Sequence, residues 1–223
     1  MNPRSIRRLA VTLTAVAMAA TIAACSSGGG ASAGASEPAA SASAAGATDC
    51  PTEQPAPLPA DETRTVTLAT PEGDIVIGIE AVLSPIAAGN FVALASCGYY
   101  DGTVFHRTAT LQDGTPFVIQ GGDPTGTGTG GPGYTITDEP VSTPYVRGTV
   151  AMARTSEPDS VGSQFFIVLD DKDGEILSSA NTYQIIGNVT SGMEAVDAIY
   201  AASGGAELPD QPIAITAATV ANP

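Results

Sequence analysis

Apolar and polar side chains alternate over residues 65–70, and residues 75–79 form a second short apolar segment, Ile-Val-Ile-Gly-Ile. Successive side chains of a β-strand point to opposite faces of a sheet, so each segment is predicted to be a strand with one buried face. The four residues between them, Pro71 to Asp74, are of types that favour tight turns. The two segments together predict a β-hairpin.

Two further segments have the apolar spacing that is typical of helices. The first begins at Ser84 and Pro85, an N-cap residue followed by a proline at the first helical position, and it ends near Gly98. The second spans residues 193–202, where apolar side chains fall on one face. We therefore expect one helix early in the chain and one late.

The rest of the apolar residues form short runs between residues 104 and 189, separated by Gly, Pro and Asp. This pattern predicts several strands that pair over long sequence distances, and a last strand is expected between residues 213 and 220. The order is mainly β. Periodicity alone does not distinguish a barrel from a sandwich.

The first 24 residues have the features of an export signal: three arginines near the start, then an apolar stretch without acidic residues. The stretch ends in Ile22-Ala23-Ala24-Cys25-Ser26, which resembles a bacterial lipobox. We expect signal cleavage before Cys25 and diacylation of its thiol, which would anchor the protein to the membrane by lipid. An uncleaved membrane helix over the same residues is the alternative.

Residues 25–60 are mostly Ser, Gly, Ala and Pro, a composition that buries too little apolar surface to fold. They are predicted to form a disordered tether between the lipidated Cys25 and a single folded domain over residues 61–223. The expected location is the extracytoplasmic face of the cell membrane.

The chain is strongly acidic. Its formal net charge is −15, and removal of the first 24 residues takes away three arginines and no acidic residue, which makes the charge −18. Such a charge repels a nucleic-acid backbone, so DNA or RNA binding is not expected. The acidity is explained more simply by solubility outside the cell.

The chain has three cysteines. If Cys25 carries lipid, Cys50 and Cys97 remain as an even pair in an oxidising compartment, where disulfides persist. The sequence leaves two alternatives open: a bridge that pins the end of the tether to the domain, or two unpaired thiols.

A glycine-rich stretch, residues 121–133, contains G-x-G-x-x-G at Gly128, Gly130 and Gly133. A phosphate-binding loop of this type opens a helix, whereas the residues that follow here are predicted to continue as a strand. Nucleotide binding is therefore not expected.

His106 is the only histidine, so a histidine metal cluster is impossible, and a packing or hydrogen-bonding role is expected for it. No metal or other cofactor is predicted.

Four separated blocks carry a resemblance to a known family: Phe105-His106-Arg107, residues 117–123, residues 148–153 and residues 162–168. Read in this order, they resemble the cyclophilin family of peptidyl-prolyl cis-trans isomerases. The resemblance covers residues 65–220. It implies a mainly β fold in which a closed antiparallel eight-stranded β-barrel is capped by two α-helices, and it implies isomerisation of X-Pro peptide bonds.

The resemblance also implies roles for particular residues. Arg107 would be catalytic, because a guanidinium that donates hydrogen bonds around the proline weakens the amide resonance that keeps the peptide planar. Phe117 and Phe166 would wall the proline ring, and Gln120 would orient Arg107 or the substrate backbone. The other expected substrate-binding residues are Val118, Ala153, Arg154, Gln164 and Tyr183.

The chain departs from the family pattern in several places. Five extra residues, within Thr110 to Thr115, separate Arg107 from Phe117 and could lengthen a loop over the site. The chain contains no tryptophan, the residue that many members use to bind cyclosporin, so weak inhibition by this drug is expected. The floor of the pocket is not assigned, and Ile176 and Leu177 are the candidates.

The leading hypothesis is a lipid-anchored, monomeric prolyl isomerase that assists the folding of exported proteins and acts on proline-containing polypeptides. Two alternatives remain open. One is a non-catalytic module on the same fold that only binds proline-containing segments or partner proteins. The other is an unrelated β-barrel lipoprotein that holds a small apolar ligand in an enclosed cavity.

Overall fold

The computed structural model describes residues 49–180 and 182–222. The expected signal peptide, the acylated Cys25 and the tether up to residue 48 lie outside the described residues. The described elements, in chain order, are β1 (Thr63–Thr70), β2 (Gly73–Glu80), α1 (Pro85–Ser96), β3 (Arg107–Thr110), β4 (Pro116–Gly121), β5 (Thr149–Met152), β6 (Phe165–Val168), α2 (Asp173–Ala180), β7 (Ile185–Ser191), α3 (Met193–Ala202) and β8 (Ala217–Ala221).

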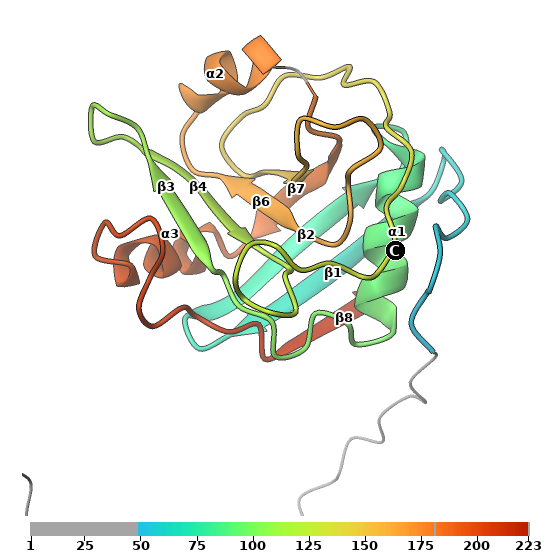
Figure 1. Ribbon diagram of the computed structural model, residues 1–223, viewed down its shortest axis with the longest axis horizontal. Helices are drawn as coiled ribbons and strands as arrows, with labels where there is room; N and C mark the ends of the chain where they lie inside the picture. The colour runs from blue at the N-terminus through green and yellow to red at the C-terminus, as the bar shows by residue number, and fades with distance from the viewer. Residues whose placement is uncertain (1–48, 181, 223) are drawn as a thin grey trace, which may run out of the picture. The chain divides into compact units, whose positions relative to one another are not determined.

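The eight strands form one antiparallel sheet in the order β3-β4-β6-β5-β7-β2-β1-β8. The predicted hairpin is confirmed as β1 and β2, with Val66 opposite Ile77. Helices α1 and α3 lie at opposite sides of the sheet (Figure 1). Within the described residues, no helix is long and apolar enough to span a bilayer.

The prediction of a closed barrel is wrong. The sheet ends at β3 on one side and at β8 on the other, and these two strands do not pair with each other. The segments that precede them meet at an isolated bridge between Val104 and Ala214, with backbone hydrogen bonds on either side of it, and do not extend into a ladder between the two strands. The outer edge of β3 is met instead by the loop that follows α3, where the Thr108 N–H donates to the Glu207 carbonyl at 2.9 Å. A loop therefore occupies the edge that a β3–β8 ladder would need.

The prediction of two helices was incomplete. The early and late helices are confirmed as α1 and α3, but a third helix, α2, covers Asp173–Ala180. It is only eight residues long, and its buried residues are Asp173, Gly174 and Leu177. So short a helix, with a polar residue among its buried positions, has little of the apolar spacing by which a helix is recognised in a sequence.

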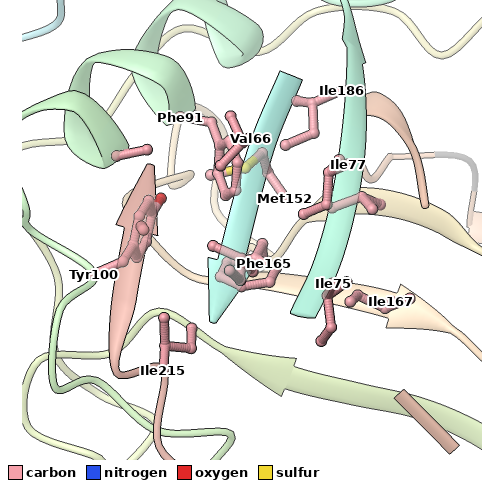
Figure 2. Packing of buried hydrophobic residues seen from close by; sticks show 14 of the residues in the cluster. Val66, Ile75, Ile77, Phe91, Tyr100, Met152, Phe165, Ile167, Ile186 and Ile215 are labelled. Carbon is pink, nitrogen blue, oxygen red and sulfur yellow. The ribbon is translucent and has the colours of Figure 1, made fainter. Parts of the chain in front are cut away.

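The main core lies between the sheet and the two longer helices. Phe91 on α1 packs against Tyr100 and Phe165, with ring centroids 5.1 and 5.3 Å apart, and all three side chains are fully buried (Figure 2). The inward-facing residues of β1 and β2, among them Leu68 and Ile77, are also fully buried. The core thus supports the strands that carry the site.

Helix α1 begins with an unexpected cap. Ser84 occupies the N-cap position, but its hydroxyl donates to the Leu83 carbonyl rather than capping the helix. The Glu139 carboxylate takes this role from a distant loop, because its two oxygens accept hydrogen bonds from the N–H groups of Ile86 and Ala87, each at 2.9 Å. A negative charge at this helix end also suits the helix dipole.

Residues 49–60, which the sequence places at the end of the tether, run along α1. Cys50 and Cys97 form a disulfide with a Cα–Cα distance of 5.2 Å. Further along, the Leu58 N–H donates to the Pro85 carbonyl at 2.9 Å. The approach is close: a Cβ added to Gly89 would lie 2.5 Å from the Ala56 carbonyl oxygen, so only glycine fits there.

Candidate active site

Pairing of the strands brings the key polar side chains together. Arg107 on β3 lies opposite Gln120 on β4, and Gln120 lies opposite Phe166 on β6. Residues that face each other across an antiparallel pair share one face of the sheet. Arg107, Gln120 and Phe166 therefore line one continuous strip across three strands.

An irregularity in the β3–β4 hairpin adds an aromatic side chain to this strip. Ala109 pairs with Val118, whereas the next residue, Thr110, pairs with Pro116, so the register shifts and Phe117 has no partner on β3. Bulges of this kind re-aim a side chain. As a result, the consecutive residues Phe117 and Val118 both line the same cavity, which regular alternation would forbid.

The cavity beside Arg107 has a volume of about 160 Å³. Its walls combine aromatic and aliphatic side chains with three polar ones, Arg107, Gln120 and Arg154. The lining residues are Arg107, Phe117, Val118, Gln120, Ala153, Arg154, Phe166, Leu177 and Tyr183. The rings of Phe166 and Tyr183 meet edge to face, with centroids 5.3 Å apart.

The structure thus brings together the site residues expected from the sequence, with one exception. Gln164 does not line this cavity but a neighbouring one of about 440 Å³, which shares Gln120, Ala153 and Arg154 with it. Leu177 on α2 supplies the floor that the sequence left unassigned. Ile176, the other candidate, is 47% exposed.

A chain of side-chain hydrogen bonds links Arg107 to the glycine-rich loop. Arg107 Nη1 approaches Gln120 Oε1 at 3.4 Å, and Gln120 Nε2 donates to Gln164 Oε1 at 2.9 Å. Gln164 Nε2 in turn donates to the carbonyls of Gly128 and Gly130, at 3.0 and 2.9 Å. These contacts hold the two amides in defined orientations at the boundary between the two cavities.

The glycine-rich loop is organised around Asp123. Its carboxylate accepts hydrogen bonds from the backbone N–H groups of Thr125, Gly128 and Gly130, at 2.7, 2.6 and 3.0 Å. Burial opposes ionisation of this carboxyl, but the hydrogen bonds outweigh burial and lower its pKa to about 2. The N–H groups that a phosphate would need are therefore already used, and no helix follows the loop.

Arg154 is held away from free solvent. Its guanidinium forms an ion pair with Asp138 at 2.8 Å, Nη2 donates to the Glu157 carbonyl at 2.7 Å, and its side chain is 11% exposed. Arg107 is more open, at 36% exposed, and pairs with Glu207. Sequence reasoning missed Glu207, because nothing in the local pattern marks a loop residue 100 positions away as a neighbour of Arg107.

The inserted residues extend the β3–β4 hairpin rather than cover the site. The Leu111 N–H donates to the Thr115 carbonyl at 2.8 Å, which closes the hairpin tip, and no residue from 110 to 115 lines either cavity.

His106 lines neither cavity. It is 5% exposed, and burial lowers its pKa. Within the described part of the chain, no group of three or more His, Cys, Asp and Glu side chains is arranged to hold a metal ion.

Known proteins share this sequence and this fold. The family model for cyclophilin type peptidyl-prolyl cis-trans isomerases matches residues 65–220. A probable peptidyl-prolyl cis-trans isomerase of Brucella abortus is 37% identical over 170 residues, covering 70% of this chain and 84% of that protein. A probable peptidyl-prolyl cis-trans isomerase A of Mycobacterium leprae is 37% identical over 182 residues, covering 71% and 93%.

A solved structure agrees with these relatives. The crystal structure of a cyclophilin type peptidyl-prolyl cis-trans isomerase of Cryptosporidium parvum is 32% identical, with a TM-score of 0.62, and covers 72% of this chain and 99% of that one. The same protein was also solved in the presence of the dipeptide Ala-Pro, with a TM-score of 0.61. The chain therefore belongs to the cyclophilin-type peptidyl-prolyl cis-trans isomerases, and its activity is the cis-trans isomerisation of prolyl peptide bonds.

Proposed function

We propose that the cavity beside Arg107 binds the proline ring of a polypeptide and that Arg107 is the catalytic residue for rotation about the preceding peptide bond. The observation that carries this proposal is the position of the guanidinium. It lies at the edge of a small cavity walled by Phe117 and Phe166 and floored by Leu177. A cavity with aromatic and aliphatic walls and the Arg107 guanidinium at its rim suits a ring that has an amide beside it.

Prolyl isomerisation requires neither a nucleophile nor a proton transfer. The barrier of roughly 18 to 20 kcal/mol arises from amide resonance, which is lost when the bond twists. As it is lost, the lone pair of the prolyl nitrogen localises and becomes a hydrogen-bond acceptor. An N–H of Arg107 that donates to this nitrogen stabilises the twisted state more than the planar one, which is the condition for catalysis.

The neighbouring cavity of about 440 Å³ extends the site along the polypeptide. It shares Ala153 and Arg154 with the proline cavity and adds Gln164. We assign to it the residues that precede the proline. Both cavities are lined by residues of the same folded domain.

The proposed role of Arg107 is tested by the rate of isomerisation of a short Ala-Pro peptide. A charge-assisted hydrogen bond contributes roughly 1.5 to 3 kcal/mol, so Arg107→Ala is expected to lower kcat/KM by at least ten-fold. Arg64→Ala is the matched control, because Arg64 also pairs with a carboxylate, that of Glu62, but lines neither cavity. A folded Arg107→Ala variant with wild-type turnover would contradict the role.

We further propose that the protein acts outside the cytoplasm, anchored through a diacylated Cys25 at the membrane, where it assists the folding of exported proteins. Two observations support this location: the export-signal pattern of residues 1–24 and the disulfide between Cys50 and Cys97, a bond that persists in oxidising compartments.

Labelling with radioactive palmitate in the producing cell tests the anchor. The wild-type protein is expected to incorporate the label and to sediment with membranes, and Cys25→Ala is expected to lose the label. A wild-type protein without label would refute the anchor and leave the isomerase activity unaffected.

A further inference from the structure

The loop that follows α3 returns to the sheet beside Arg107. Its backbone is fixed on the edge of β3 by two hydrogen bonds from a single residue. The Thr108 N–H donates to the Glu207 carbonyl at 2.9 Å, and Thr108 Oγ1 donates to the Ala206 carbonyl at 2.6 Å. In Figure 1 this loop runs from α3 past the start of β3 towards β8. The arrangement holds the Cα of Glu207 close to the residue that precedes Thr108, which is Arg107.

The side chain of Glu207 contacts one particular edge of the Arg107 guanidinium. Glu207 Oε1 accepts from Nε at 2.9 Å and lies 2.8 Å from Nη2. A guanidinium has five N–H donors in a rigid plane. Two of them face Glu207 and a third, on Nη1, faces Gln120. One N–H on each of Nη1 and Nη2 has no hydrogen-bond partner among the described residues.

The carboxylate is not needed to hold the loop. The loop is anchored to β3 through carbonyl groups of its backbone, and the Glu207 side chain is 64% exposed, so it contributes little packing. The hydrogen bonds of its carboxylate within the described part of the chain go to Arg107 alone. Its effect on the protein therefore passes through the guanidinium.

We propose that Glu207 is a positioning residue for the isomerase reaction: its carboxylate holds the Arg107 guanidinium by the Nε and Nη2 edge and leaves the outer Nη edge free to donate to the prolyl bond. The inference rests on the catalytic role proposed for Arg107. A free arginine side chain samples many rotamers and loses about 2 kcal/mol of rotamer entropy when it is held. A fixed carboxylate on the non-reacting edge favours the orientation in which catalysis occurs.

The size of the effect follows from the exposure of the pair. Exposed ion pairs each contribute little, so Glu207→Ala is expected to lower kcat about two- to five-fold. KM for an uncharged Ala-Pro peptide is expected to stay within about two-fold, because Phe117, Phe166 and Leu177, which enclose the proline, are unchanged. Glu207→Gln keeps an acceptor oxygen, so its kcat is expected to lie between those of the wild type and Glu207→Ala.

The experiment is a double-mutant cycle on kcat and KM, measured with an uncharged Ala-Pro peptide. It compares the wild type, Glu207→Ala, Arg107→Ala and the double variant. If Glu207 acts through Arg107, Glu207→Ala lowers kcat in the wild type and has no further effect in the Arg107→Ala background. Glu62→Ala is the matched control, because it removes the carboxylate of the Arg64 ion pair away from both cavities. It is expected to leave kcat unchanged.

Salt provides a second readout. Because the pair is exposed, added salt screens it, and the wild-type kcat is expected to fall between 20 mM and 1 M NaCl more than that of Glu207→Ala. An unchanged or raised kcat for Glu207→Ala would overturn the inference, and a raised value would mean that the carboxylate competes with the substrate. An additive effect in the double variant would also overturn it. Full activity of Arg107→Ala would instead refute the role proposed for Arg107, so the two failures are distinguishable.

Discussion

Removal of the disulfide between Cys50 and Cys97 is expected to destabilise the folded domain by about 4 kcal/mol. The bond joins residues separated by 47 positions, and a cross-link that closes a loop of this length lowers the entropy of the unfolded chain by about 14 cal/mol/K, which is about 4 kcal/mol at 25 °C. A domain of this size is stable by only about 5 to 15 kcal/mol. The bond therefore accounts for a large share of the total stability.

The perturbation is the double substitution Cys50→Ala and Cys97→Ala, which leaves no free thiol in the domain. Urea unfolding at equilibrium measures the free energy of unfolding of both proteins, with and without a reducing agent. Reduction is expected to lower the stability of the wild type to that of the variant and to leave the variant unchanged. Isomerase activity is expected to be retained, because neither cysteine lines a cavity.

A loss below about 1 kcal/mol would refute this reasoning. It would mean that residues 49–60 keep the unfolded chain compact, or hold their place along α1, without the covalent bond. The contacts that would then have to suffice are the packing of Leu58 against the core and of Ala56 against Gly89. Two hydrogen bonds add to them, from the Leu58 N–H to the Pro85 carbonyl and from the Thr137 N–H to Gln54 Oε1.

Three other predictions concern the loops and the pocket. Asp123→Asn is expected to loosen the glycine-rich loop. In the wild type the folded-state pKa of this carboxyl, about 2, lies below the ordinary value of 3.8, so the carboxylate stabilises the fold fully above pH 4 and this contribution is lost as the pH falls towards 2. The loss of stability between pH 5 and pH 2 should therefore be less steep in the variant. Glu139→Ala is expected to destabilise the domain by about 1 to 3 kcal/mol in urea unfolding, because it leaves two N–H groups of α1 without acceptors, whereas an unchanged free energy would mean that another group caps the helix. Cyclosporin is expected to inhibit isomerisation only weakly, because the chain has no tryptophan, and tight stoichiometric inhibition would contradict this.

Local patterns in the sequence predicted the elements that are defined by neighbours along the chain. The β1–β2 hairpin follows from alternation around a turn, and α1 and α3 follow from helical spacing. The residues that line the cavity, such as Phe117 and Phe166, were predicted from the family resemblance. A sequence motif identifies which side chains belong to a site even when the positions of those side chains in space are unknown.

Features that depend on contacts between distant segments were not predictable in this way. Alternation reports which face of a strand is buried but not which edge strands pair, so it could not reveal that β3 and β8 remain apart. Three such residues are Leu177, on a short helix, and Glu139 and Glu207, on irregular loops. In these segments no repeating spacing of apolar residues indicates which side chains will be neighbours in space.

The central claim is that Arg107 acts on the twisted state of the prolyl bond and not on the binding of the planar peptide. The most direct test measures two quantities on one Ala-Pro peptide by NMR: the dissociation constant, from a titration, and the catalysed exchange rate between cis and trans at saturation. For Arg107→Ala the account predicts an exchange rate lowered by at least ten-fold, about 1.4 kcal/mol of transition-state stabilisation, and a dissociation constant within about three-fold of the wild type. A variant that binds much more weakly but exchanges bound peptide at the wild-type rate would contradict it.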